Sequence, residues 1–188
     1  MKQQLAKQKI QKRTAVTSGV IAAVAWSMTA NTWAASDRAT ITITGKVLAN
    51  TCTIDSASAR QNITLPNIAD RDIKGVGKTG GETNISIALT DCGKAASNVV
   101  VTASGTPDAE DPTAFSNTVT DGAEGVGLYF YQTGGTEKFK PDGSVRQTSP
   151  LTPSVDNTLT YKASYVGTND TVKAGGFSTV VNMTFEYQ

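Results

Sequence analysis

The stretch "ATITITGKVL", from Ala39 to Leu48, decides the fold class of this chain. Small or apolar residues alternate in it with polar ones: Ala39, Ile41, Ile43, Gly45 and Val47 against Thr40, Thr42, Thr44 and Lys46. A period of two predicts a β-strand with one buried face, and β-branched Ile and Thr suit a pleated surface. Residues this close to the start of a domain are usually frayed. A well-formed strand in this position therefore raises the question of whose core it enters.

Residues 1–34 have the composition of a secretory signal peptide, with a basic front and a weakly apolar run from Ala15 to Ala30. Thr32 and Ala34 supply the small residues that a signal peptidase recognises, so we expect cleavage after Ala34 and export. The alternative is a membrane anchor. Export is favoured, because the apolar run is shorter than the roughly 20 residues of a spanning helix and contains polar residues.

Removal of this leader leaves residues 35–188, enough for one domain with a single hydrophobic core. Five of the 17 Lys and Arg residues lie in the leader, so 12 remain against 16 Asp and Glu, a net charge of about −4. A mildly acidic chain without a basic cluster offers no electrostatic footprint for nucleic acid or anionic lipid. We therefore expect no nucleic-acid partner.

The chain contains two cysteines, Cys52 and Cys92. An even number of cysteines in an exported chain predicts a disulfide. Closing a loop of about 40 residues would stabilise the fold by roughly 4 kcal/mol in the chain-entropy model. A metal pair or a redox pair fits poorly, because the chain has no His and the two cysteines are far from a C-x-x-C spacing. We expect neither a metal nor a cofactor.

The rest of the chain consists of short strand-like segments separated by Gly, Asn, Asp and Pro. We predict strands in 61–68, 82–92, 98–105, 125–135, 158–167 and 175–188. The polar stretches 105–116 and 132–154 are expected to be surface loops or short hairpins. No window has a sustained helical period, so the pattern predicts a single all-β domain, a sandwich or a barrel.

Residues typical of catalysis are sparse. Without His, neither a Ser-His-Asp nor a Cys-His arrangement can form. The acidic pairs and clusters lack the ligand spacing of a calcium loop: Asp70 and Asp72; Asp108, Glu110 and Asp111. "GVGKTGG", at 75–81, lacks the spacing of a phosphate-binding loop. Four N-x-[ST] triplets, beginning at Asn62, Asn84, Asn169 and Asn182, are expected by chance in such a Thr-rich chain. No catalytic residue is assigned, and we expect that the protein is not an enzyme.

Five segments together resemble one family, the type 1 fimbrial (pilin) subunits of the chaperone–usher pathway of Gram-negative bacteria. "ATITITGKVLANTCTID" is similar to the family's N-terminal extension leading into the first cysteine, and "ISIALTDC" to the segment around the second. "GVGLYFYQTGG" resembles its central strand. "LTYKASYVG", followed by A-G-x-F and a penultimate Tyr187, resembles its C-terminal signature. The resemblance covers essentially all of residues 35–188, although the long "GTPDAEDPTAFSNTV" segment departs from it.

The resemblance implies an immunoglobulin-like β-sandwich that lacks its last strand and is completed by donor-strand addition. Residues 50–188 would be this pilin domain, and 35–49 the donor extension that fills the groove of a neighbouring subunit. The donor face would be Ala39, Ile41, Ile43, Gly45 and Val47. Gly45 interrupts the apolar row, which indicates a close approach of the two backbones. Pairing of Ala39–Val47 within its own domain remains the alternative.

The family also implies partners and a destination. A periplasmic chaperone would bind the groove and the last strand, namely Phe177, Thr179, Val181, Met183, Phe185, Tyr187 and Gln188. An outer-membrane usher would then pass the subunit to neighbouring pilin subunits, and a tip adhesin would end the fibre. The protein would be exported through the periplasm to a surface fimbria and support adhesion. Shaft subunit and tip adaptor both fit the sequence. A single-domain adhesin that binds a host receptor or glycan is the alternative from another functional class.

Overall fold

The computed structural model describes residues 39–45, 47 and 51–188. The predicted leader, 1–34, and the positions 35–38, 46 and 48–50 of the predicted extension lie outside this part of the chain. The described residues belong to two units, one ending at Thr44 and one spanning Gly45–Gln188. The second unit contains every strand described below.

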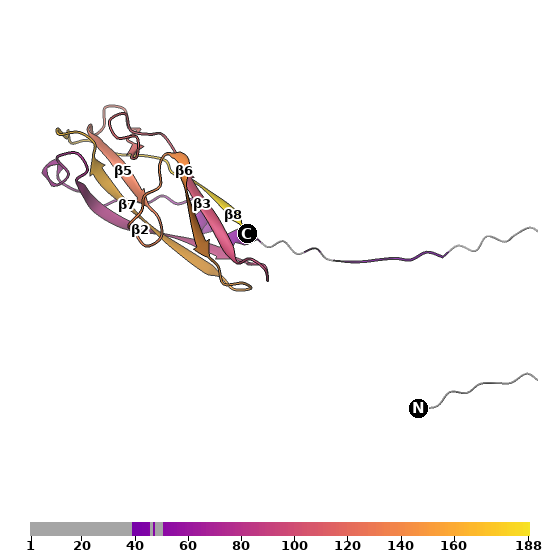
Figure 1. The fold of residues 1–188 in the computed structure, drawn as a ribbon. Coiled ribbons are helices and arrows are strands. Elements are labelled where there is room, and N and C mark those ends of the chain that lie inside the picture. The colour runs from indigo at the N-terminus through magenta and orange to yellow at the C-terminus, as the bar shows by residue number, and fades with distance from the viewer. Residues whose placement is uncertain (1–38, 46, 48–50) are drawn as a thin grey trace, which may run out of the picture. The chain divides into compact units, whose positions relative to one another are not determined.

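In the part of the chain that the structure describes, eight strands form two sheets in which all neighbours are antiparallel (Figure 1). The first sheet has the order β1 (Thr53–Ile54), β2 (Thr79–Thr90), β7 (Asn157–Gly167), β5 (Val126–Tyr131) and β4 (Phe115–Ser116). The second has the order β6 (Asp142–Pro150), β3 (Asn98–Ser104) and β8 (Asn182–Tyr187). Among the described residues, helical structure is limited to two short pieces, α1 (Ser56–Ala59) and a 3₁₀ turn (Asp70–Asp72). Within the described ranges, no helix has the length and hydropathy of a membrane span.

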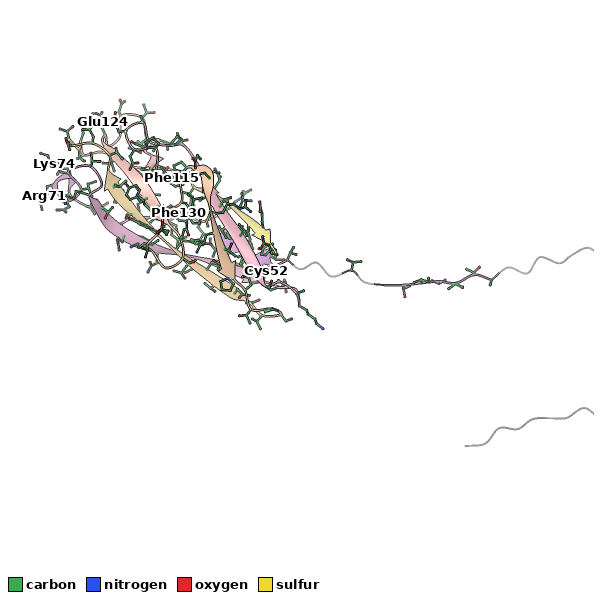
Figure 2. All side chains as sticks on the ribbon, in the orientation of Figure 1. Cys52, Arg71, Lys74, Phe115, Glu124 and Phe130 are labelled. Carbon is green, nitrogen blue, oxygen red and sulfur yellow. A yellow bond between two sulfur atoms is a disulfide. The ribbon has the colours of Figure 1, made fainter. Side chains whose placement is uncertain are left out.

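The core lies between the two sheets. Period-two alternation turns Leu159, Tyr161 and Ala163 of β7 inward, where they join Leu89 of β2 and the buried residues of β3. Phe130 stacks on Phe139 at 5.7 Å and on Tyr161 at 5.6 Å between ring centroids. Burial of these aromatic side chains supplies a large share of the stability. In Figure 2, Phe115 and Phe130 lie within the sandwich, while Arg71, Lys74 and Glu124 lie at the end away from Cys52.

The disulfide predicted from the sequence is confirmed. Cys52 and Cys92 are bonded at 2.04 Å between their sulfur atoms, across 40 positions of sequence. The bond ties the residue before β1 to the chain that follows β2, and the backbone N–H of Gly93 donates to the carbonyl of Thr51 beside it. It therefore fixes the point at which the chain enters the sandwich.

Residues 39–45 and 47 form no strand and are exposed. Ile41, Ile43 and Val47 keep 81%, 88% and 98% of their surface accessible. Pairing of Ala39–Val47 within its own domain stays the alternative prediction. A strand is stable only when a neighbour pairs with its backbone, so burial of this stretch in another subunit stays a prediction.

Three expectations about strands were wrong in part. Residues 61–68 form no strand: Pro66 lacks an N–H for a ladder, and the side-chain amide of Gln61 bonds the carbonyl of Ser86 instead. The last strand begins only at Asn182, not near 175. The polar stretch 132–154 was expected to be loops or short hairpins, yet it contains the nine-residue strand β6. This strand turns Gln147 and Ser149 toward the interior, so its sequence lacks an apolar alternation.

Candidate functional site

The outer edge of β8 is open, because β3 is its only partner among the strands that the structure describes. Asn98 and Gln188 exchange backbone hydrogen bonds of 3.3 and 2.9 Å, which fixes the pattern of the ladder. Hydrogen-bonded pairs alternate in an antiparallel ladder, so Met183, Phe185 and Tyr187 direct their backbone N–H and C=O groups away from β3. This edge presents a row of unpaired donors and acceptors to another strand.

A cavity of about 700 Å³ lies between the sheets. Its floor consists of inward-facing side chains of the five-stranded sheet: Ile85 and Ile87 of β2, Val126, Leu128 and Phe130 of β5, and Ala163 and Tyr165 of β7. One wall is formed by residues between 58 and 73, and the other by residues between 172 and 183. We call this cavity the groove. Its floor is mostly apolar, its walls also contain polar residues, and it runs beside the segment that leads into β8.

The first wall of the groove is held by side-chain bonds to β2. The Nε2 of Gln61 donates to the carbonyl of Ser86 at 2.8 Å, and the Oγ of Ser58 accepts from the N–H of Ala88 at 3.0 Å. Ile63 is 41% exposed and lines the groove with Leu65 and Ile68. These groove residues were missed in the sequence, where Ile63 and Leu65 indicated only a strand.

The last-strand face predicted from the sequence divides between two environments. Phe177, Thr179, Val181 and Met183 line the groove. Phe185 and Tyr187 are half-buried and pack against the core, and Gln188 bonds to Asn98 through its backbone. The hydroxyl groups of Thr179 and Tyr187 are buried and have no hydrogen-bond partner among the described residues. Burial also raises the pKa of the Tyr187 phenol.

The acidic residues that the sequence singled out serve local turns. The carboxylate of Asp70 accepts from the N–H of Arg71, and that of Asp108 accepts from the N–H groups of Glu110 and Asp111. In the part of the chain that the structure describes, no group of three or more His, Cys, Asp or Glu side chains could hold a metal ion. These clusters therefore have a structural explanation in turn formation.

A second polar cluster lies on the other face of the five-stranded sheet. The hydroxyl of Tyr129 donates to Asp111 at 2.7 Å, and the Nζ of Lys138 lies 3.4 Å from the centre of the Tyr129 ring. Burial and the bond to Asp111 raise the pKa of Tyr129 to about 12. Burial alone would raise the pKa of Asp111, but hydrogen bonds from Thr113 and Tyr129 outweigh it and lower the pKa. The cluster joins the loop before β4 to β5.

Residues 41–188 match the family described as Fimbrial protein. This chain belongs to that family. It is 32% identical over 166 residues to the laminin-binding fimbrial subunit ElfA of Escherichia coli O157:H7, covering 85% of this chain and 91% of the relative. It is 31% identical over 148 residues to the S-fimbrial protein subunit SfaG of Escherichia coli O6:K15:H31, covering 79% and 82%.

Solved structures support the same assignment. The type I fimbria protein BPSL1626 of Burkholderia pseudomallei superposes with a TM-score of 0.56 at 30% identity, over 73% of this chain and 89% of that one. The P pilus rod subunit PapA superposes with a TM-score of 0.62 at 21% identity, over 73% and 99%. The fold is therefore that of a pilin, an immunoglobulin-like sandwich that is incomplete beside β8.

The family assignment confirms the resemblance found in the sequence. The chain is a fimbrial subunit, which implies a place in a surface fimbria. The family is one of structural, non-enzymatic proteins, so the expectation that the chain is not an enzyme is also confirmed.

Proposed function

We propose that this subunit polymerises by donor-strand exchange, with the groove of one copy receiving residues 39–47 of the next. The observation that carries the proposal is that one chain contains both an exposed strand-like stretch and a groove suited to receive it. An alternating row of exposed apolar side chains accompanies a groove with a mostly apolar floor beside an open strand edge. Full burial of Ile41, Ile43 and Val47 would contribute roughly 1.5–3 kcal/mol each. Backbone hydrogen bonds from the first residues of the stretch to β8 would occupy part of its open edge, as in β-strand addition elsewhere.

An antiparallel register with Gly45 beside Thr179 fits the two rows best. It places Val47 beside Phe177, Ile43 beside Val181 and Ile41 beside Met183, so that apolar side chains meet. The Thr179 hydroxyl, which is buried and unpartnered among the described residues, then meets a position without a side chain. There it lies within reach of backbone groups, which lowers the cost of burying it.

Before assembly, the same groove would be covered by a strand of a periplasmic chaperone, and an outer-membrane usher would mediate the exchange. The predicted leader, cleaved after Ala34, would bring the chain to the periplasm. A tip adhesin would then stand at one end of the fibre. An uncovered groove and strand edge are aggregation hazards, which gives the chaperone a physical purpose.

Shaft subunit or adaptor is our first choice of role, and stoichiometry in isolated fibres distinguishes the two. A second role is favoured by one observation: the 32% identical relative is described as laminin-binding. A receptor-binding subunit would bind immobilised laminin or a glycan as a purified fibre. Fibres that bind neither would leave the structural role alone.

The proposal is tested by a thermal melt of a chain that begins at Asn50, with and without a peptide of residues 35–49. We expect the peptide to raise the melting temperature by more than 10 °C, because it completes the sandwich. The matched control is the same peptide with Ile43→Asp, which should have little effect. A truncated domain that is stable alone and indifferent to both peptides would contradict donor-strand exchange.

A further inference from the structure

The second wall of the groove includes a segment that belongs to neither sheet. Residues 173–178 line the groove, yet β8 begins only at Asn182. Backbone bonds connect this segment to residues 118–124: the N–H of Thr118 donates to the carbonyl of Ser178 at 2.8 Å, and that of Ala123 to Gly176 at 2.8 Å. Glu124 and Lys173 exchange two more backbone bonds and form an ion pair of 2.6 Å. The position of this wall therefore depends on the loop 117–124.

The side chain of Asn117 connects the loop and the wall by four hydrogen bonds. Its Nδ2 donates to the carbonyls of Ala123 and Gly176, both at 2.9 Å. Its Oδ1 accepts from the N–H groups of Val119 at 3.2 Å and Ser178 at 3.0 Å. Two of the bonds shape the loop and two hold the wall, so one amide fixes the distance between them. Only Asn or a similar amide offers two donors and an acceptor at this point.

Close backbone contact supports the same arrangement. A methyl group added at Gly175 would lie 2.5 Å from the backbone N of Ala123, and one added at Gly122 would lie 2.5 Å from the carbonyl O of Gly176. Neither position has room for it, since real Cβ atoms do not approach so closely. The wall thus rests directly on the loop, and any larger residue at Gly175 must push it away.

We propose that Asn117 is a positioning residue for donor-strand capture, and this rests on the function proposed above. Asn117 does not line the groove itself. It acts through residues 173–178, which meet the incoming strand where Val47 is expected to sit. In the described structure, this wall is held by its bonds to the loop and by no sheet ladder, so loss of the amide loosens it while the core stays intact. The incoming strand then has to order the wall as well as itself, and this slows capture.

The test measures association and dissociation of a fluorescent peptide of residues 39–49 with the chain from residue 35 onward. We expect Asn117→Ala to slow association at least tenfold. Asn117→Asp keeps the bonds to Val119 and Ser178, so it should fall between Asn117→Ala and the parent chain. Gly175→Ala displaces the same wall without touching Asn117 and should also slow association, which keeps the test decisive if Asn117→Ala fails to fold.

Two controls separate positioning from general destabilisation. Asn169→Ala removes bonds confined to the turn at Thr171 and should leave the association rate unchanged. Val166→Ala lowers stability through the cluster around Tyr129, outside the groove, and should also leave the rate unchanged. Unaltered association in both Asn117→Ala and Gly175→Ala would overturn the inference. A parent chain that binds no peptide would instead overturn donor-strand exchange itself.

Discussion

Two stretches of this chain, residues 39–47 and residues 177–187, have the same alternation of apolar and polar side chains but differ in burial. In the first, Ile41 and Ile43 are more than four-fifths exposed. In the second, the odd-numbered side chains from Phe177 to Tyr187 are half-buried against the core and the groove. The alternation therefore specifies that a stretch has one face to bury, and not which chain supplies the partner.

The difference lies in the backbone partners. The strand β8 pairs with β3 along its whole length, so its odd face is held over the core while its other edge stays open. The described residues before Thr51 have no ladder partner. The strand β8 therefore has a backbone partner on one edge, whereas the described residues of 39–47 have none. The proposed exchange between copies would give each of them the missing partner.

The largest effect is expected from a charge on the apolar face of the first stretch. Ile43→Asp would place a carboxylate in the groove of a neighbour, which costs several kcal/mol without a partner. Fibre formation should fall below detection by electron microscopy, while the domain of the same chain keeps its stability. Thr42→Asp, one residue away on the opposite face, is the matched control and should still assemble. Normal fibres from Ile43→Asp would remove the donor role from this stretch.

A smaller effect should distinguish the first stretch, residues 39–47, from the folded domain that contains the second. Replacing both Cys52 and Cys92 by Ala opens a loop of about 40 residues and should lower the free energy of unfolding by roughly 4 kcal/mol. Urea titration measures this loss. The extension of the variant should still bind the groove of an unmodified chain, because residues 39–47 lie outside the disulfide loop. If the variant lost both its stability and its ability to act as a donor, residues 39–47 and the folded domain would not act independently.

The smallest effect is expected on the sheet face away from the groove. The pKa of Asp111 is lowered in the fold. The hydrogen bonds of its carboxylate therefore stabilise the fold above pH 3.8, its ordinary pKa, and this stabilisation is lost as the pH falls through the lowered pKa. Asp111→Asn should cost about 1 kcal/mol at pH 7, since the group is partly exposed, and less at pH 3. Thermal melts at the two pH values test this. Peptide capture at pH 7 should not change. An equal loss of stability at both pH values would contradict a negatively charged Asp111 in the fold.

The sequence predicted much of this fold because most of its strands have either alternating apolar residues or a continuous apolar run. β2, β3, β5 and β7 lie where the pattern placed them, and export predicted the disulfide. β6 was missed because a buried Gln147 and Ser149 replace the apolar residues of its inner face. Residues 61–68 have strand-like alternation but find no backbone partner.

The groove was predicted by family resemblance and only in part by the residues. The face from Phe177 to Met183 was identified, whereas the opposite wall at Ile63 and Leu65 was not. The sequence gives no indication of the role of Asn117, because nothing distinguishes it there from other Asn residues in polar loops. Its importance comes from four hydrogen bonds, two of which join segments about 60 positions apart, and only the folded structure brings these segments together.

The place of the disulfide has a mechanical consequence for a fibre assembled as proposed. Four positions separate Val47, the last donor residue, from Cys52, where the covalent bond to Cys92 begins. Tension pulled along the fibre would enter each domain at Cys52 and pass through the disulfide to the end of β2. The two-residue strand β1 would then bear little of the load, and the groove would be loaded in shear along the seated strand. The disulfide would thus hold the entry to each domain by a covalent bond, and the noncovalent part of the load path would be the seated strand between subunits.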